Sequence, residues 1–228
     1  MAKFSKIIHE THENLLINKF IEIFRAKLRK KLKSSKRFTF VLAGGKSPIK
    51  LYKKLSKTKE INWNKVDFFI GDERYVSEKS KYSNINLCKK YFLKNAKISK
   101  NQIFKVDIRK KSVKEDSNSY ENKIKKYFYK KKIIFDLILL GVGEDGHIAS
   151  LFTNNINKKT NKIVDFVKKK DFFRITLTIK SINNSKFIFL WAPGKKKSRI
   201  KKKILKDKNL SYPISFLKKK NSFLFYSN

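Results

Sequence analysis

The stretch FDLILLGVGEDGHIASLF, residues 135–152, joins a short apolar run to a glycine-rich turn that carries two acids and a histidine. Its first part is rich in residues that favour buried strands, and the run stops at Gly141. Two earlier segments repeat this form, FTFVLAGG at residues 38–45 and VDFFIGD at residues 66–72. The repetition predicts several short buried strands, each followed by a glycine-containing loop.

Helical patterns separate the predicted strands. Apolar residues recur at helical spacing over residues 12–33, and shorter helical patterns cover residues 47–57, 84–96 and 119–132. Further along, residues 174–179, 187–192 and 222–227 have the composition of strands and residues 197–206 that of a helix. This alternation predicts an α/β fold with an open, mostly parallel sheet and helices on both faces. No linker rich in Ser, Gly or Pro interrupts the chain, so we expect a single domain over residues 1–228.

All seven glycines fall in four loops that follow predicted strands: AGGKSP (43–48), GDER (71–74), GVGEDGH (141–147) and APGKKK (192–197). In a chain with so little glycine, this placement indicates backbone positions that do not tolerate a side chain. Ligands of parallel α/β sheets bind beyond the carboxyl ends of the strands. We therefore expect the four loops to gather along one edge of the sheet.

The first of these loops has the features of an anion site. Ser47 is expected to cap a helix that starts at Pro48, so that Gly44, Gly45, Lys46 and Ser47 present backbone N–H groups at the helix N-terminus. A helix N-terminus with an adjacent lysine favours phosphate, although many loops between a strand and a helix look similar.

The second loop places Asp72 and Arg74 just past a strand end. The two side chains could form a structural ion pair. A functional role is favoured because of the strand-end position and because the chain has only 7 Arg among its 58 basic residues.

The third loop matches the G-x-G-x-x-G pattern of dinucleotide-binding proteins, but Glu144 and Asp145 stand where the phosphates would lie. Two carboxylates would repel that ligand. Asp145 beside His147 instead indicates an acid that orients an imidazole, with His147 as the titratable base. No second His or Cys stands at ligand spacing, so we expect no metal site.

The formal net charge of +40 raises the alternative of a protein that binds nucleic acid. Such proteins concentrate charge on one face and favour Arg, whereas lysines are scattered along the whole of this chain. We interpret the charge as solvated surface and expect no specific nucleic-acid partner.

A single cysteine, Cys88, excludes an intramolecular disulfide and is interpreted as a small core residue on a helix. The apolar runs are too short and too often broken by Lys to span a bilayer, and the first residues contain acids and histidines where a secretory signal needs an apolar segment. We expect a cytoplasmic protein with no membrane partner.

Several segments together resemble, in order and spacing, the glucosamine-6-phosphate isomerase/6-phosphogluconolactonase family. They are LAGGKSPIKLYKKL, DFFIGDERYVSEKSKYSNINL, FDLILLGVGEDGHIASLF, RITLTIKSINNSKFIFLWAPGKKK and YPISFL. The likeness extends roughly over residues 38–217. The resemblance implies a Rossmann-like sheet of the sugar-phosphate isomerase type. Lys46 stands where the family usually has Ser or Thr, and Thr153 stands where it has Pro.

The residues after the histidine distinguish two branches of the family. The deaminase branch continues into an aromatic-Asn-Glu sequence, whereas this chain continues as IASLFT, similar to the lactonase branch. The resemblance therefore implies hydrolysis of 6-phosphogluconolactone to 6-phosphogluconate in the oxidative pentose phosphate pathway, without a cofactor. We expect the protein to be a monomer.

The resemblance also implies roles for individual residues. The lactone phosphate would lie on Gly45, Lys46 and Ser47, with Arg74 and Lys197 as charge partners, although Lys195 and Lys196 are rivals of Lys197. His147 would act as general base, Asp145 would hold its imidazole, and Asp72 would position sugar hydroxyls or share proton transfer.

Three other interpretations stay open at this point. A deaminase or isomerase on the same fold would release ammonia from glucosamine 6-phosphate. A basic nucleic-acid-binding protein would keep a sequence or structure preference at physiological salt. A non-catalytic interaction protein on this fold is disfavoured by the complete Asp-Gly-His loop.

Overall fold

The structure is a computed structural model that describes residues 4–109, 112–129, 131–156, 159–206 and 212–228. Its main elements follow one another in this order: β1 (Lys6–Glu10), α1 (Glu13–Leu32), β2 (Phe38–Leu42), α2 (Ile49–Leu55), β3 (Val66–Ile70), β4 (Asp72–Arg74), α3 (Asn84–Cys88), β5 (Ile103–Phe104), α4 (Val113–Phe128), β6 (Leu137–Gly141), β7 (Val164–Lys168), β8 (Phe173–Leu177), α5 (Ile179–Asn183), β9 (Phe187–Ala192), α6 (Ser198–Lys206) and β10 (Ser222–Ser227).

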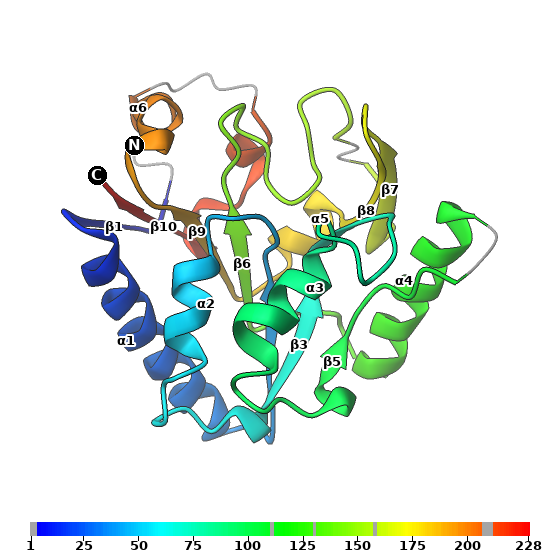
Figure 1. Cartoon of the computed structure of the whole chain (residues 1–228), viewed down its shortest axis with the longest axis horizontal. Coiled ribbons are helices and arrows are strands. Elements are labelled where there is room, and N and C mark those ends of the chain that lie inside the picture. Colours follow the sequence, from blue (N-terminus) through cyan, green and yellow to red (C-terminus); the bar gives the residue numbers. More distant parts are fainter. Residues whose placement is uncertain (1–3, 110–111, 130, 157–158, 207–211) are drawn as a thin grey trace.

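Seven strands form the main sheet, in the order β1-β10-β9-β6-β2-β3-β5. Every pairing in it is parallel, which confirms the predicted open α/β sheet. The chain runs outward from β2 to β3 and β5, then returns to β6 on the other side of β2. Loops that leave β2 and β6 therefore diverge, and such a point in an α/β sheet opens a crevice at the carboxyl ends of the strands. Figure 1 shows β3 and β6 pointing toward that same end.

The sheet is covered on both faces because alternate strand residues point to opposite sides. Phe40 and Phe68 belong to the core under α1, α2 and α3, whereas Val41 and Phe69 belong to the core under α4, α5 and α6. The long helix α1 contributes buried aromatic rings, among them Phe20 and Phe24, which are both 0% exposed. Burying one such ring stabilises the fold by about 1.5–3 kcal/mol.

A second, three-stranded sheet has the order β4-β8-β7 and is antiparallel. Residues 174–179 were predicted as a strand, and most of them form β8, which belongs to this second sheet and not to the main parallel one. β4 follows β3 after one residue, and its Asp72 pairs with Thr176 of β8. The alternation of apolar residues predicts a strand but does not specify the neighbouring strand with which it pairs. In the structure, β8 pairs with β4 and β7.

Two predicted helices differ in detail. α2 begins at Ile49 with Pro48 in the N-cap position, so the prediction that Ser47 caps this helix is wrong. Pro48 fits there because it has no N–H to leave unpaired at a helix start. The predicted helix 84–96 is an α-helix over Asn84–Cys88 that continues as a π-helical turn over Lys89–Leu93.

Within the described ranges, no helix combines the length and the apolar character that crossing a bilayer requires.

Candidate active site

The four glycine-containing loops meet at a cavity of about 790 Å³ at the carboxyl end of the main sheet. All four contribute to its lining, which confirms the predicted gathering along one edge. Its wall carries seven basic and three acidic side chains: Lys46, Lys50, Arg74, Arg174, Lys195, Lys196 and Lys197 against Glu13, Asp72 and Glu144. A cavity of this charge attracts anions.

His147 and Asp145 form a pair in the loop after β6. The Asp145 Oδ1 lies 2.5 Å from Nδ1 of His147, and the His147 backbone N–H donates to the same oxygen at 3.3 Å. Burial opposes the charge on Asp145, but the hydrogen bond and the attraction from His147 outweigh it and lower the pKa of the carboxyl. The imidazole lines the cavity, so one ring nitrogen is held by the acid while the ring faces the space where a ligand would lie.

Gly143 makes room for that imidazole. A Cβ atom at residue 143 would lie 2.1 Å from Nδ1 of His147, a distance that no real contact allows. Gly44 has a similar relation to the buried side chain of Asn84, whose Oδ1 would lie 1.9 Å from an added Cβ. The amide of Asn84 donates to the Asp72 carbonyl at 2.7 Å and so joins the first two loops. At these two positions glycine is required by close packing.

Asp72 is nearly buried, with 8% of its surface exposed, and its carboxylate lines the cavity. Its Oδ2 accepts a hydrogen bond of 2.7 Å from Ser150, which lies three residues after His147. The structure thus brings Asp72 and His147 to the same cavity, as the sequence predicted, whereas Asp145 does not line it and contacts the imidazole through Nδ1.

Arg74 and Arg174 line the same cavity, and the sequence analysis did not select Arg174. Nη1 of Arg74 donates to the Tyr82 carbonyl at 2.8 Å, but the buried Nε atoms of both arginines have no hydrogen-bond partner among the described residues. Burial and the repulsion from Arg74 lower the pKa of Arg174. Two neighbouring guanidinium groups with unused donors form a place for an anion with several acceptor oxygens. The scarcity of Arg, which selected Arg74, was the signal that would also have found Arg174.

The lysines of the last loop differ in burial. Lys195 and Lys196 are exposed, whereas Lys197 is half-buried in the wall of the cavity. Burial lowers the pKa of Lys197, against the raising effect of Glu144 and Asp145. Lys197 is therefore the least exposed lysine of this run, while Gly45, Lys46 and Ser47 lie on the cavity wall as predicted.

Glu73, which the sequence analysis did not select, fixes the second loop from behind. Its buried carboxylate accepts from the backbone N–H groups of Arg74, Asn84 and Ile85, at 2.8, 2.7 and 2.8 Å. Burial raises the pKa of Glu73, and these hydrogen bonds oppose the rise. Since successive residues of a strand point to opposite sides, Glu73 points inward while Asp72 and Arg74 reach the cavity.

Across the described ranges, no three His, Cys, Asp or Glu side chains are grouped so that they could hold a metal ion. Cys88 is buried at the end of α3, and burial raises the pKa of its thiol, as expected for a core residue.

Comparisons with known proteins identify relatives that belong to one family. The family profile for glucosamine-6-phosphate isomerases/6-phosphogluconolactonase matches residues 11–225. A 6-phosphogluconolactonase of Thermotoga maritima is 32% identical over 208 residues, which cover 90% of this chain and 91% of that protein. A 6-phosphogluconolactonase of Chlamydia pneumoniae is 30% identical over 232 residues, which cover 97% of this chain and 87% of that protein. The crystal structure of 6-phosphogluconolactonase from T. maritima superposes with a TM-score of 0.83 at 30% identity and covers 97% of this chain and 99% of that one.

Proposed function

Because the chain belongs to the glucosamine-6-phosphate isomerase/6-phosphogluconolactonase family, we propose that it hydrolyses 6-phosphogluconolactone to 6-phosphogluconate. The observation that carries this proposal is the His147–Asp145 pair, which faces a cavity with a strongly basic wall. A base beside an anion site matches a phosphorylated ester that must be attacked by water.

The phosphate group is proposed to bind among Arg74, Arg174 and Lys197, with the loop that contains Lys46 on the other side. The unpaired Nε donors of both arginines support this assignment, because a phosphate supplies acceptor oxygens for them. The half-burial of Lys197 makes it the best candidate of the three lysines in its loop. Binding through the phosphate would fix the lactone carbonyl relative to His147 and reduce the entropy cost of the reaction.

His147 is proposed to act as general base at C1 of the lactone. The imidazole takes a proton from a water molecule while the water oxygen bonds to C1, and the protonated imidazole then gives that proton to the ring oxygen as the C1–O bond breaks. Asp145 would hold the ring through Nδ1 and stabilise its positive charge. Asp72 would position the sugar hydroxyls or share proton transfer.

Lactonase activity on 6-phosphogluconolactone generated in situ, corrected for spontaneous hydrolysis, tests the proposal. The same preparation is incubated with glucosamine 6-phosphate, and the release of ammonia is measured. Acceleration of lactone opening without ammonia release supports the lactonase. Ammonia release without lactone opening would replace it with the deaminase branch of the family.

We further propose that residues 1–228 act as one domain, as a monomer in the cytoplasm, without a cofactor, a metal or a specific nucleic-acid partner. These statements remain predictions from the sequence. Sedimentation analysis of the purified protein tests the monomer.

A further inference from the structure

Ser150 lies in the loop that carries His147, and its side chain reaches across to the start of β4. Its Oγ donates to Oδ2 of Asp72 at 2.7 Å, and its backbone N–H lies 3.2 Å from the hydroxyl of Thr176. Thr176 is itself opposite Asp72 in the pairing of β4 with β8. Ser150 thus connects the loop that carries His147 with β4, which contains Asp72, and with β8, which pairs with β4.

The backbone before Ser150 has an unusual conformation. Ala149 has a φ of 49°, in the left-handed region that residues with a Cβ rarely adopt. Such a conformation persists only where surrounding contacts compensate for it, and here it precedes the two hydrogen bonds of Ser150. The strained turn directs the Ser150 side chain toward Asp72.

Ser150 cannot touch a ligand, because it is 0% exposed. Asp72 lines the cavity, and its carboxylate has no other hydrogen bond from a described side chain or backbone group in the structure. A lone donor of this kind decides which way the carboxylate faces. It also stabilises the carboxylate, because a hydrogen bond to a charged acceptor is among the strong ones.

We infer that Ser150 is a positioning residue for the reaction. Its hydroxyl holds the Asp72 carboxylate in a fixed orientation relative to His147, so that Ser150 acts on catalysis through Asp72. This inference rests on the proposed function of the cavity. It predicts that removal of the hydroxyl impairs turnover while the proposed phosphate-binding side chains, to which the hydroxyl does not donate, keep their affinity.

The test compares full-length Ser150→Ala with wild type on 6-phosphogluconolactone. We expect kcat to fall about tenfold to a hundredfold, as for loss of a hydrogen bond to a charged group, with KM within about twofold. Ser185→Ala is the matched control, because Ser185 is equally buried and its Oγ has no hydrogen-bond partner among the described residues. Its kcat and its melting temperature should stay close to wild type.

A double-mutant cycle shows whether Ser150 acts through Asp72. Ser150→Ala should have almost no further effect on kcat in an Asp72→Ala background, because the acceptor is already gone. If Asp72→Ala falls to the spontaneous rate, the same cycle is measured on the free energy of unfolding, which reports the coupling of Ser150 with Asp72 without turnover.

Additive effects of the two substitutions, or a Ser150→Ala kcat within twofold of wild type, would overturn the inference while leaving the lactonase proposal intact. A wild-type protein that does not accelerate lactone opening would remove the proposed function and this role together.

Discussion

At the scale of single residues, the fit between Gly143 and His147 gives a sharp prediction. An added methyl group at residue 143 would collide with Nδ1 of the imidazole, 2.1 Å away, and push the ring from its acid. We expect Gly143→Ala to lower kcat at least tenfold, because a displaced base loses its alignment with the substrate. Steady-state kinetics with the spontaneous rate subtracted measure this effect.

Gly141→Ala is the matched control for that substitution. Residue 141 lies in the same loop region, and a Cβ there would meet nothing within 4 Å. Its kcat should remain within about twofold of wild type. Equal losses for both substitutions would show that the loop tolerates no side chain at all, and the specific account of Gly143 would be abandoned.

The lysines after β9 provide a second prediction at this scale. Lys197→Ala should raise KM by about tenfold, because it removes the half-buried cation of the proposed phosphate site. Lys195→Ala removes an exposed cation from the same loop and should change KM less than twofold. The opposite order of the two KM values would transfer the phosphate role to Lys195.

The sequence indicated the position of a residue near the cavity where that residue stands in a glycine-containing loop, and it missed one that lies within a strand. Asp72, Arg74, Asp145 and His147 were selected because they stand in strand-end loops. Arg174 is the second residue of β8, and apart from the scarcity of Arg nothing local in the sequence shows that pairing with β4 carries it to the cavity.

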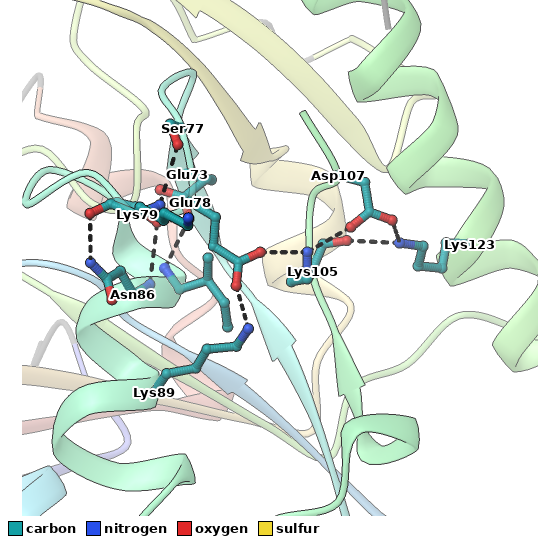
Figure 2. Close-up of polar contacts among 11 residues, drawn as sticks. Glu73, Ser77, Glu78, Lys79, Asn86, Lys89, Lys105, Asp107 and Lys123 are labelled. Atoms are coloured by element: carbon teal, nitrogen blue, oxygen red, sulfur yellow. Dashed lines mark hydrogen bonds and ion pairs between the residues drawn. The ribbon is translucent and has the colours of Figure 1, made fainter. Parts of the chain in front are cut away.

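At the scale of elements, a chain of ion pairs joins the loop after β4 to α4. Glu78 pairs with Lys89 and, at 2.7 Å, with Lys105; Lys105 also pairs with Asp107 at 2.7 Å, and Asp107 with Lys123 at 2.8 Å. Figure 2 shows the side chains in line, together with Asn86, which donates to the carbonyls of the same loop. Because that loop ends at Tyr82, whose carbonyl holds Arg74, the chain of ion pairs supports the basic wall of the cavity.

Asp107 gives this chain of ion pairs a measurable pH dependence. Burial opposes its charge, but hydrogen bonds from Lys105 and Lys123 outweigh this and lower its pKa to about 2. A carboxyl with a lowered pKa contributes stability that is complete above its unfolded value of about 4 and is lost as the pH falls through its folded value. Melting temperatures of wild type and Asp107→Asn should therefore differ at pH 6 and converge toward pH 2.

The size of that difference is limited by solvent, because 37% of the Asp107 side chain is exposed. We expect a few degrees at low salt and less at high salt. Glu22→Gln, which breaks the more exposed pair with Lys19, serves as the control and should leave the melting temperature almost unchanged. A difference at pH 6 that persists unchanged to pH 2 would contradict the assigned role of Asp107.

Prediction of elements from sequence was reliable for the buried strands and poor at the edges. β2, β3, β6 and β9 are almost wholly buried, so their apolar runs are visible in the sequence. β1 buries a single residue of five, Ile8, and β5 has only two residues, so neither has a readable pattern. The predicted helix 119–132 missed the first six residues of α4, 113–118, for a related reason, because five of them are polar and the cap Ser112 is their main signal.

At the scale of the whole molecule, the net charge of +40 should act on association with an anionic substrate. A phosphorylated lactone approaching this surface is attracted over distances that salt screens. We expect kcat/KM to fall severalfold between about 20 and 500 mM salt, with kcat nearly constant because the bound substrate is shielded. A kcat/KM that is independent of salt would show that the charge is without influence on catalysis.

The central claim is that His147 is the base of a lactonase, and His147→Ala tests it most directly. Its hydrolysis of 6-phosphogluconolactone generated in situ is compared with wild type and with His9→Ala, whose imidazole stacks on Tyr226 away from the cavity. We predict that kcat of His147→Ala falls by about 10²–10⁴ while His9→Ala retains wild-type activity. A His147→Ala kcat within threefold of wild type would contradict the account and remove His147 from the role of general base.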